Sequence, residues 1–324
     1  MGDYSKATLR KALLEVFDDS EILEDEPMSL YTTFEIGGMA DLMVEPSSVE
    51  QIVAAIDAAR KADSPYWVLG CGSNVLVSDA GLRGLVIHLG ERFAEIEVNG
   101  ARITAQAGAT NKAIASIALE NSLAGYEFAS GIPGSVGGAA YMNAGAYDEE
   151  FKGVATSVTC LDSSLNVVEL GNEDAQWGYR SSRMAREGLI VLSVSIELHE
   201  GEKADIAAKM ADLKQRRETK QPLEHPSAGS TFKRPAGYVA GKLIDDAGMR
   251  GHRCGGACVS TKHAGFVVND LNATARDVRN VIEDVQGAVE KQFGVKLEPE
   301  VRMIGFEFGD EPPAHGCKVH GHRH

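Results

Sequence analysis

The chain contains an uncharged, glycine-rich stretch, Gly131-Ile132-Pro133-Gly134-Ser135-Val136-Gly137-Gly138-Ala139-Ala140-Tyr141-Met142-Asn143-Ala144-Gly145-Ala146-Tyr147. Glycine allows positive φ and lets a ligand approach the peptide groups directly. Successive N–H groups in a Gly/Ser turn form a concavity that binds anions such as a pyrophosphate. A tight buried crossover between packed elements would use the same residues, so this stretch alone leaves both interpretations open.

A second uncharged turn lies upstream, in the sequence Leu69-Gly70-Cys71-Gly72-Ser73-Asn74-Val75-Leu76-Val77. Two such turns beside apolar strands favour one shared ligand cradle. The segment is not a Rossmann fingerprint, because Val75 stands where the third glycine belongs and begins a strand instead of a helix. A P-loop is also disfavoured, since Gly237 to Lys242 is one spacer short and Leu243 replaces the Ser or Thr that holds magnesium.

Three further segments follow in a fixed order and complete a resemblance. Together with the two glycine turns, the chain resembles the UDP-N-acetylenolpyruvoylglucosamine reductase (MurB) family from about Tyr31 to Phe306. Arg180 and Ser230 lie fifty positions apart, which resembles the shorter subgroup that lacks an extra substrate-covering loop. The three segments are Gly178-Tyr179-Arg180-Ser181-Ser182-Arg183, Ser227-Ala228-Gly229-Ser230-Thr231-Phe232-Lys233-Arg234-Pro235 and Glu298-Pro299-Glu300-Val301-Arg302.

The resemblance implies a mixed α/β (α+β) fold. We expect a two-part FAD-binding domain of the vanillyl-alcohol-oxidase (PCMH) type, followed by a C-terminal α/β substrate-binding domain whose last strand carries Glu300. The expected ranges are 1–90 and 91–201 for the two FAD-binding subdomains, 202–308 for the substrate domain, and 309–324 for a disordered His-rich tail.

The resemblance also implies an activity: NADPH-dependent reduction of UDP-N-acetylglucosamine enolpyruvate to UDP-N-acetylmuramate through noncovalent FAD, a step of peptidoglycan precursor synthesis. Another FAD oxidoreductase of the same fold is the alternative, and it would keep both glycine turns without needing the later motifs. A catalytically silent flavin or nucleotide-sugar binder is a second alternative, disfavoured because the motif positions of the enzyme are all filled.

The catalytic residues implied by the resemblance are Arg180, Ser230 and Glu300. A guanidinium grips a carboxylate in bidentate fashion, so Arg180 would stabilise the enediolate that forms as hydride arrives. Ser230 would donate the proton, with Ser227 as its local competitor. Glu300 would pair with Arg180 or relay a proton. Each of these side chains also has a plain alternative, either a solvated surface charge or a turn hydrogen bond.

The resemblance assigns binding roles to two further sets of residues. The substrate-binding set is Lys220, Lys233 and Arg234. The cofactor-binding set is Gly70, Cys71, Gly72, Ser73, Asn74, Val75, Gly131, Ile132, Pro133, Gly134, Ser135, Gly138, Asn143 and Gly145.

Composition excludes several classes of partner. Thirty-two basic against forty-seven acidic residues give a net charge of −15, which disfavours nucleic acid and anionic membranes. The N-terminal residues carry charges without a long apolar run, so we expect neither a signal peptide nor a membrane-spanning helix, and a cytoplasmic location. We expect no metal site, and the family suggests a monomer.

Local patterns predict elements around these motifs. Asn99-Gly100 between alternating segments predicts a β-hairpin. Ser47 to Glu50 and Thr274 to Asp277 predict capping boxes that open amphipathic helices. The charged segment from Glu202 to Lys220 is expected to be a helix that begins the third domain.

Overall fold

The computed structural model describes residues 5–308, which form two compact units. Unit 1 comprises the chain up to Leu23, Leu42–Cys71 and Gly84–Thr219. Unit 2 comprises Glu24–Asp41, Gly72–Arg83 and the chain from Lys220 onward.

The compact units do not follow the boundaries expected after residues 90 and 201, because the chain changes unit several times. The functional division into 1–90, 91–201 and 202–308 therefore remains a prediction. The His-rich segment 309–324 lies outside the described residues.

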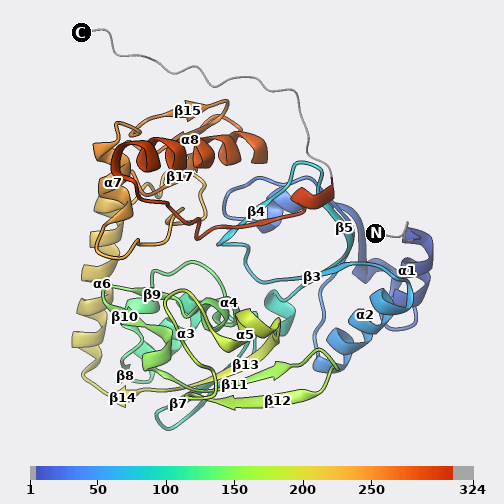
Figure 1. Cartoon of the computed structure of the whole chain (residues 1–324). Helices are drawn as coiled ribbons and strands as arrows, with labels where there is room; N and C mark the ends of the chain where they lie inside the picture. Colours follow the sequence, from blue (N-terminus) through green and yellow to red (C-terminus); the bar gives the residue numbers. More distant parts are fainter. Residues whose placement is uncertain (1–4, 309–324) are drawn as a thin grey trace. The chain divides into compact units, whose positions relative to one another are not determined.

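Unit 1 is built on a five-stranded antiparallel sheet in the order β12-β11-β13-β7-β6. Helices α3 and α4 pack on this sheet, and Figure 1 shows them on its upper face. The sheet strands are β6 (Ile96–Asn99), β7 (Arg102–Gln106), β11 (Ala155–Leu161), β12 (Val167–Gly171) and β13 (Ile190–Glu197). The helices of the unit are α1 (Lys6–Leu13), α2 (Val49–Lys61), α3 (Asn111–Glu120), α4 (Val136–Met142), α5 (Arg183–Glu187) and α6 (Lys203–Lys220).

Eight further strands form two short pairs and a second, four-stranded sheet. Two-stranded pairs join β8 (Leu123–Ala124) to β14 (His199–Glu200) and β9 (Gly145–Ala146) to β10 (Glu149–Glu150). A four-stranded sheet has the order β1-β2-β5-β3, with β3 and β5 parallel. Its strands are β1 (Ile22–Pro27), β2 (Met39–Val44), β3 (Tyr66–Leu69) and β5 (Leu82–His88).

Unit 2 contains a three-stranded antiparallel sheet and a separate parallel pair. The sheet has the order β15-β16-β17, and α8 packs against all three strands (Figure 1). The parallel pair joins β4 to β18, which come from opposite ends of the chain. The elements are β4 (Val75–Val77), α7 (Ala240–Asp246), β15 (Arg253–Cys254), β16 (Ala257–Val259), β17 (Val267–Asn269), α8 (Ala275–Phe293) and β18 (Arg302–Ile304).

Each unit has its own apolar core, which explains why each is compact. In unit 1 the buried sheet residues, such as Val158 and Val194, join the helix residues Ile114 and Val136. In unit 2 the inner face of α8 meets the short strands. A side chain of this size contributes about 1.5–3 kcal/mol when it is fully buried.

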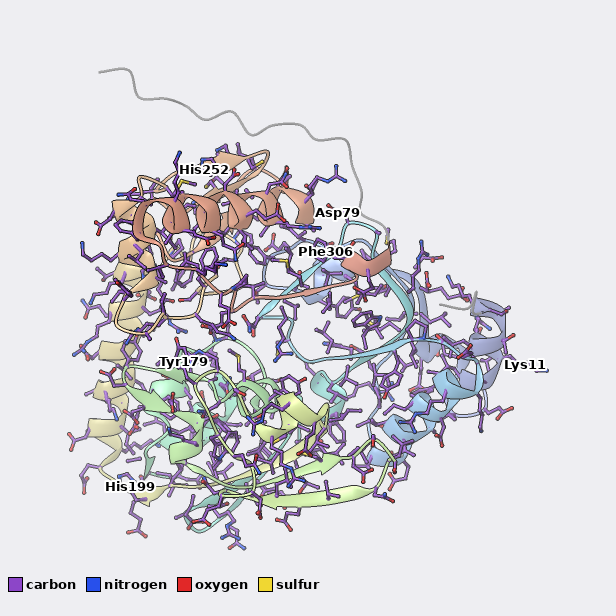
Figure 2. All side chains as sticks on the ribbon, in the orientation of Figure 1. Lys11, Asp79, Tyr179, His199, His252 and Phe306 are labelled. Atoms are coloured by element: carbon purple, nitrogen blue, oxygen red, sulfur yellow. The ribbon has the colours of Figure 1, made fainter. Side chains whose placement is uncertain are left out.

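Asp79 ties the segment after β4 to the start of α8 within unit 2. Its two carboxylate oxygens accept the N–H groups of Ala275 and Arg276 at 2.8 and 3.1 Å. Figure 2 labels Asp79 beside the end of this helix. A carboxylate in this position satisfies donors that an α-helix cannot pair internally.

Most local expectations are confirmed, including the mixed α+β class. Asn99 and Gly100 form the turn of the predicted hairpin between β6 and β7, with Gly100 at φ +60°. Thr274 and Asp277 form the predicted capping box of α8. The box expected from Ser47 to Glu50 is wrong: the cap of α2 is Ser48, whose hydroxyl accepts the Gln51 N–H, and the Gln51 side chain accepts the N–H of Ser47 at 2.7 Å instead of that of the cap residue.

Candidate active site

The two glycine turns meet at Gly70 and Ser135 within unit 1. A Cβ added at Gly70 would lie 2.5 Å from Ser135 Oγ, closer than nonbonded atoms approach. Glycine at this position leaves room for the Ser135 side chain, whose hydroxyl caps α4. The two turns therefore lie close together here, and their use as one shared ligand cradle stays a prediction.

A buried hydrogen-bond network fixes the second glycine turn. The Asn111 amide donates to the Gly134 carbonyl at 3.1 Å, and the Tyr126 hydroxyl donates to Asn111 Oδ1 at 2.8 Å. Gly137 packs so closely that an added Cβ would lie 2.7 Å from the Ala107 Cβ. Burial strongly raises the pKa of Tyr126, which keeps its hydroxyl neutral and able to donate.

The guanidinium of Arg217 lies against the start of this turn. Its Nη1 would be 3.3 Å from a Cβ built on Gly131, and its Nε has no hydrogen-bond partner among the described residues. Burial lowers the pKa of Arg217, although an arginine stays charged at any ordinary pH. A half-buried cation with an unused donor beside a glycine turn is suited to hold an anion.

Sequence analysis missed Arg217 because it lies inside a charged amphipathic helix, α6, where Arg and Lys usually face solvent. The available signal was its position one helical turn before Lys220, which had been singled out for phosphate binding. Arg216, the neighbouring residue, shows the ordinary case, with an exposed ion pair to Asp212 at 2.8 Å.

Arg180 stands at the tip of a two-residue turn closed by hydrogen bonds between Gly178 and Ser181. Its backbone adopts φ +51°, a left-handed conformation that costs a non-glycine residue about 1 kcal/mol or more. Its Nη2 donates to the Gly145 carbonyl at 3.2 Å, and its guanidinium lies 5.1 Å from the centre of the Tyr179 ring. These contacts hold the guanidinium against the end of the second glycine segment.

Asn143 joins that glycine segment to the arginine turn (Figure 2 labels the adjacent Tyr179). Its side-chain amide donates to the Gly178 carbonyl at 3.0 Å, and its Oδ1 accepts the Lys152 N–H. Asn143 is fully buried and left-handed at φ +46°. The structure therefore gives Asn143 a role in positioning the Arg180 turn, and its cofactor contact remains a prediction.

The segments of Ser230 and Glu300 lie side by side within unit 2. The Glu300 N–H donates to the Thr231 carbonyl at 2.8 Å, and Phe232 forms a β-bridge with Pro299. Thr231 is fully buried, and its hydroxyl accepts the Val267 N–H at 2.9 Å. Ser230 itself is exposed, which leaves its hydroxyl accessible to a ligand.

The three cations expected to bind substrate differ in their exposure and contacts. Lys233 forms an ion pair with Glu298 at 3.0 Å, and its N–H donates to the Glu298 carbonyl at 2.9 Å. Lys220 and Arg234 are exposed. Arg180 belongs to unit 1 while Ser230 and Glu300 belong to unit 2, so their joint action remains a prediction.

The glycine turns fit a bound dinucleotide. Gly138, in the first turn of α4, is exposed, and the nearest atom outside that helix to an added Cβ is Ser135 Oγ at 3.6 Å, so no side chain covers this glycine. The N–H of Gly138 donates to Ser135 Oγ at 3.4 Å, so the backbone of this turn is already fixed within the protein. Positive charge for a diphosphate would come from Arg217, which lies beside Gly131.

Two family models match the chain. An FAD-binding domain matches residues 40–171, and the C-terminal domain of UDP-N-acetylenolpyruvoylglucosamine reductase matches residues 221–304. The first match defines an FAD-dependent flavoprotein. Neither match includes α1 or α6.

Curated relatives and a solved structure resemble nearly the whole chain. The UDP-N-acetylenolpyruvoylglucosamine reductases of Clostridium perfringens and Agathobacter rectalis are each 50% identical, over 295 residues (91% of this chain, 97% of the relative) and 310 residues (92% and 98%). The crystal structure of the Thermus caldophilus enzyme (MurB) has a TM-score of 0.74 and 33% identity, and covers 87% of this chain and 98% of its own. The chain belongs to the UDP-N-acetylenolpyruvoylglucosamine reductase family, and it is an FAD-dependent oxidoreductase.

Within residues 5–308, no group of three or more His, Cys, Asp or Glu side chains is arranged to hold a metal ion. No helix of this range is long and apolar enough to cross a membrane.

We predict that Gly70→Ala weakens FAD retention at least about tenfold, because the methyl group displaces Ser135 from the turn and a loss near 1.4 kcal/mol is tenfold in affinity. Flavin absorbance per protein after gel filtration measures it. Gly153→Ala is the matched control, since no atom lies within 4 Å of its added Cβ. Equal flavin content in both variants would contradict the assignment of Gly70.

Proposed function

We propose that the chain catalyses NADPH-dependent reduction of UDP-N-acetylglucosamine enolpyruvate to UDP-N-acetylmuramate, a step of peptidoglycan precursor synthesis. The observation that carries this proposal is the 50% identity to reductases of that name over 91% of the chain. The chemistry balances as substrate, NADPH and one proton giving product and NADP⁺. The protein is further proposed to be a monomer located in the cytoplasm.

Bound FAD, reduced by NADPH, supplies the hydride that adds to the terminal carbon of the enolpyruvyl group. The protein binds and orients the substrate, stabilises charge and delivers a proton. Negative charge moves into the substrate carboxylate as hydride arrives, so a cation aimed at that group stabilises the transition state more than the ground state.

Arg180 is the proposed cation at that carboxylate. The Gly145 carbonyl and the Tyr179 ring restrict its guanidinium before substrate binds. A preorganised donor needs little rearrangement during the reaction, which is the condition for electrostatic catalysis. The left-handed backbone of Arg180 is consistent with this role, because strained conformations concentrate at functional sites.

Ser230 is the proposed proton donor. Glu300 is the proposed partner of Arg180 or relay for the proton. The hydrogen bond from the Glu300 N–H to Thr231 keeps the two residues in one small framework. A serine hydroxyl is a weak acid, but the carbon of an enediolate is basic enough to take its proton. Lys220, Lys233 and Arg234 are the proposed substrate-binding cations. Among them Lys220 is proposed for the substrate pyrophosphate, a role suited to the point charge of a lysine.

The direct experiment is NADPH oxidation by the purified, FAD-loaded protein, with and without UDP-N-acetylglucosamine enolpyruvate. The proposal predicts oxidation that depends on this substrate and forms UDP-N-acetylmuramate stoichiometrically. A flavin-containing protein that passes electrons from NADPH to oxygen alone would instead be another FAD oxidoreductase of this fold.

We predict that Ser230→Ala slows oxidation of the reduced flavin by substrate by about 10²–10⁴, the share of a positioned acid, while flavin reduction by NADPH is unchanged. Stopped-flow absorbance separates the two half-reactions. Ser227→Ala is the control, because Ser227 is joined through its main chain to Thr33. Equal losses in both half-reactions of Ser230→Ala would contradict this role.

We predict that Arg217→Ala weakens FAD retention by about tenfold or more, as expected for loss of a charged interaction with the diphosphate. Flavin absorbance per protein after gel filtration measures it. Arg216→Ala, one residue away on the exposed side of α6, should leave the flavin content unchanged. Equal flavin content in the two variants would show that Arg217 has a structural role only.

A further inference from the structure

The peptide groups of Glu300 are held from two directions within unit 2. Its N–H donates to the Thr231 carbonyl at 2.8 Å, on the side of the serine loop. Its carbonyl accepts the side-chain amide of Asn74 at 3.1 Å. Asn74 belongs to the first glycine turn, so one residue of that turn reaches directly to the main chain of the proposed catalytic glutamate.

The main chain of Asn74 strengthens this link. Its carbonyl accepts the Arg302 N–H at 3.0 Å, and the next residues of both segments pair in parallel from Val75 with Arg302 to Val77 with Ile304. Asn74 therefore contacts the C-terminal segment on both sides of Val301. A ladder of this kind moves as one body, because shifting one strand breaks several hydrogen bonds together.

We propose that Asn74 is a positioning residue for Glu300: its amide fixes the Glu300 peptide and so sets the direction in which the carboxylate leaves the chain. The inference rests on the proposed function of Glu300. The Asn74 side chain would then have a positioning role that cofactor binding does not require. This role would connect the first glycine turn to the proton-transfer step of the reaction.

The physical basis is the precision that proton transfer needs. Rotation of the Glu300 peptide by a few tens of degrees displaces a carboxylate several bonds away by an ångström or more, and such an error lowers a rate by up to about 10². An asparagine suits the task, since its amide donates to the carbonyl. Aspartate has the same shape but presents oxygen to oxygen, so Asn74→Asp reverses the interaction.

The test compares Asn74→Ala and Asn74→Asp with Asn269→Ala. Asn269 is a matched control because its amide also donates to a main-chain carbonyl in unit 2, that of Phe34, at 3.0 Å. All variants are assayed with FAD in excess, after their flavin content is measured. We expect oxidation of the reduced flavin by substrate to fall at least about tenfold in both Asn74 variants, and to fall more than flavin reduction by NADPH does.

A double-mutant cycle with Glu300→Gln shows whether Asn74 acts through Glu300. If it does, Asn74→Ala adds less than about twofold to the loss already caused by Glu300→Gln. Multiplying losses would overturn the proposal, and so would an Asn74→Ala rate equal to that of Asn269→Ala.

Amide hydrogen exchange of the protein without substrate gives an independent readout. We expect peptides containing Glu300 to exchange about tenfold faster in Asn74→Ala than in the unchanged chain, with no such change in Asn269→Ala. Unchanged exchange at Glu300 would overturn the link. If the unchanged chain does not turn over the enolpyruvyl substrate, the proposed function fails, and exchange alone still decides whether Asn74 holds Glu300.

Discussion

Two hydrogen bonds on the main chain of Glu300 constrain the part of unit 2 on which the proposed chemistry depends. One joins Glu300 to the serine loop through Thr231, and the other joins it to the first glycine turn through Asn74. The parallel pairing of β4 with β18 extends this connection. The C-terminal strand β18 is thereby joined to the first glycine turn. Glu300 lies two residues before this strand, and not on it as the sequence had predicted, and its main chain is held by the two hydrogen bonds.

Close packing around two glycines plays the corresponding part in unit 1. A side chain at Gly70 would clash with the side chain of Ser135, and one at Gly137 would clash with Ala107. Asn143, which caps the end of α4 within the second glycine segment, holds the turn that carries Arg180. A hydrogen bond thus connects the second glycine segment to the cation proposed for the substrate, so a displacement of one would displace the other.

The sequence predicted the features that depend on neighbouring residues. The Asn99-Gly100 hairpin and the capping box at Thr274 require a few adjacent side chains, and both are present. The pairing of β4 with β18 could not be predicted in this way, because its partners are separated by more than two hundred residues and short apolar strands have no pairing preference of their own. Arg217 was missed for a related reason, since its environment is formed by Gly131, a residue far away in the sequence. The chain also changes unit within strands, where composition gives no boundary signal.

The measurement that tests the central claim most directly is an anaerobic titration of the NADPH-reduced protein with UDP-N-acetylglucosamine enolpyruvate in deuterated water. The account predicts that one equivalent of substrate restores the oxidised flavin spectrum and that the product carries two solvent-derived deuterium atoms. One lies on the carbon bearing the carboxylate, and the other lies on the terminal carbon, because the transferable hydrogen of reduced flavin exchanges with solvent. A flavin that stays reduced until oxygen is admitted would contradict it.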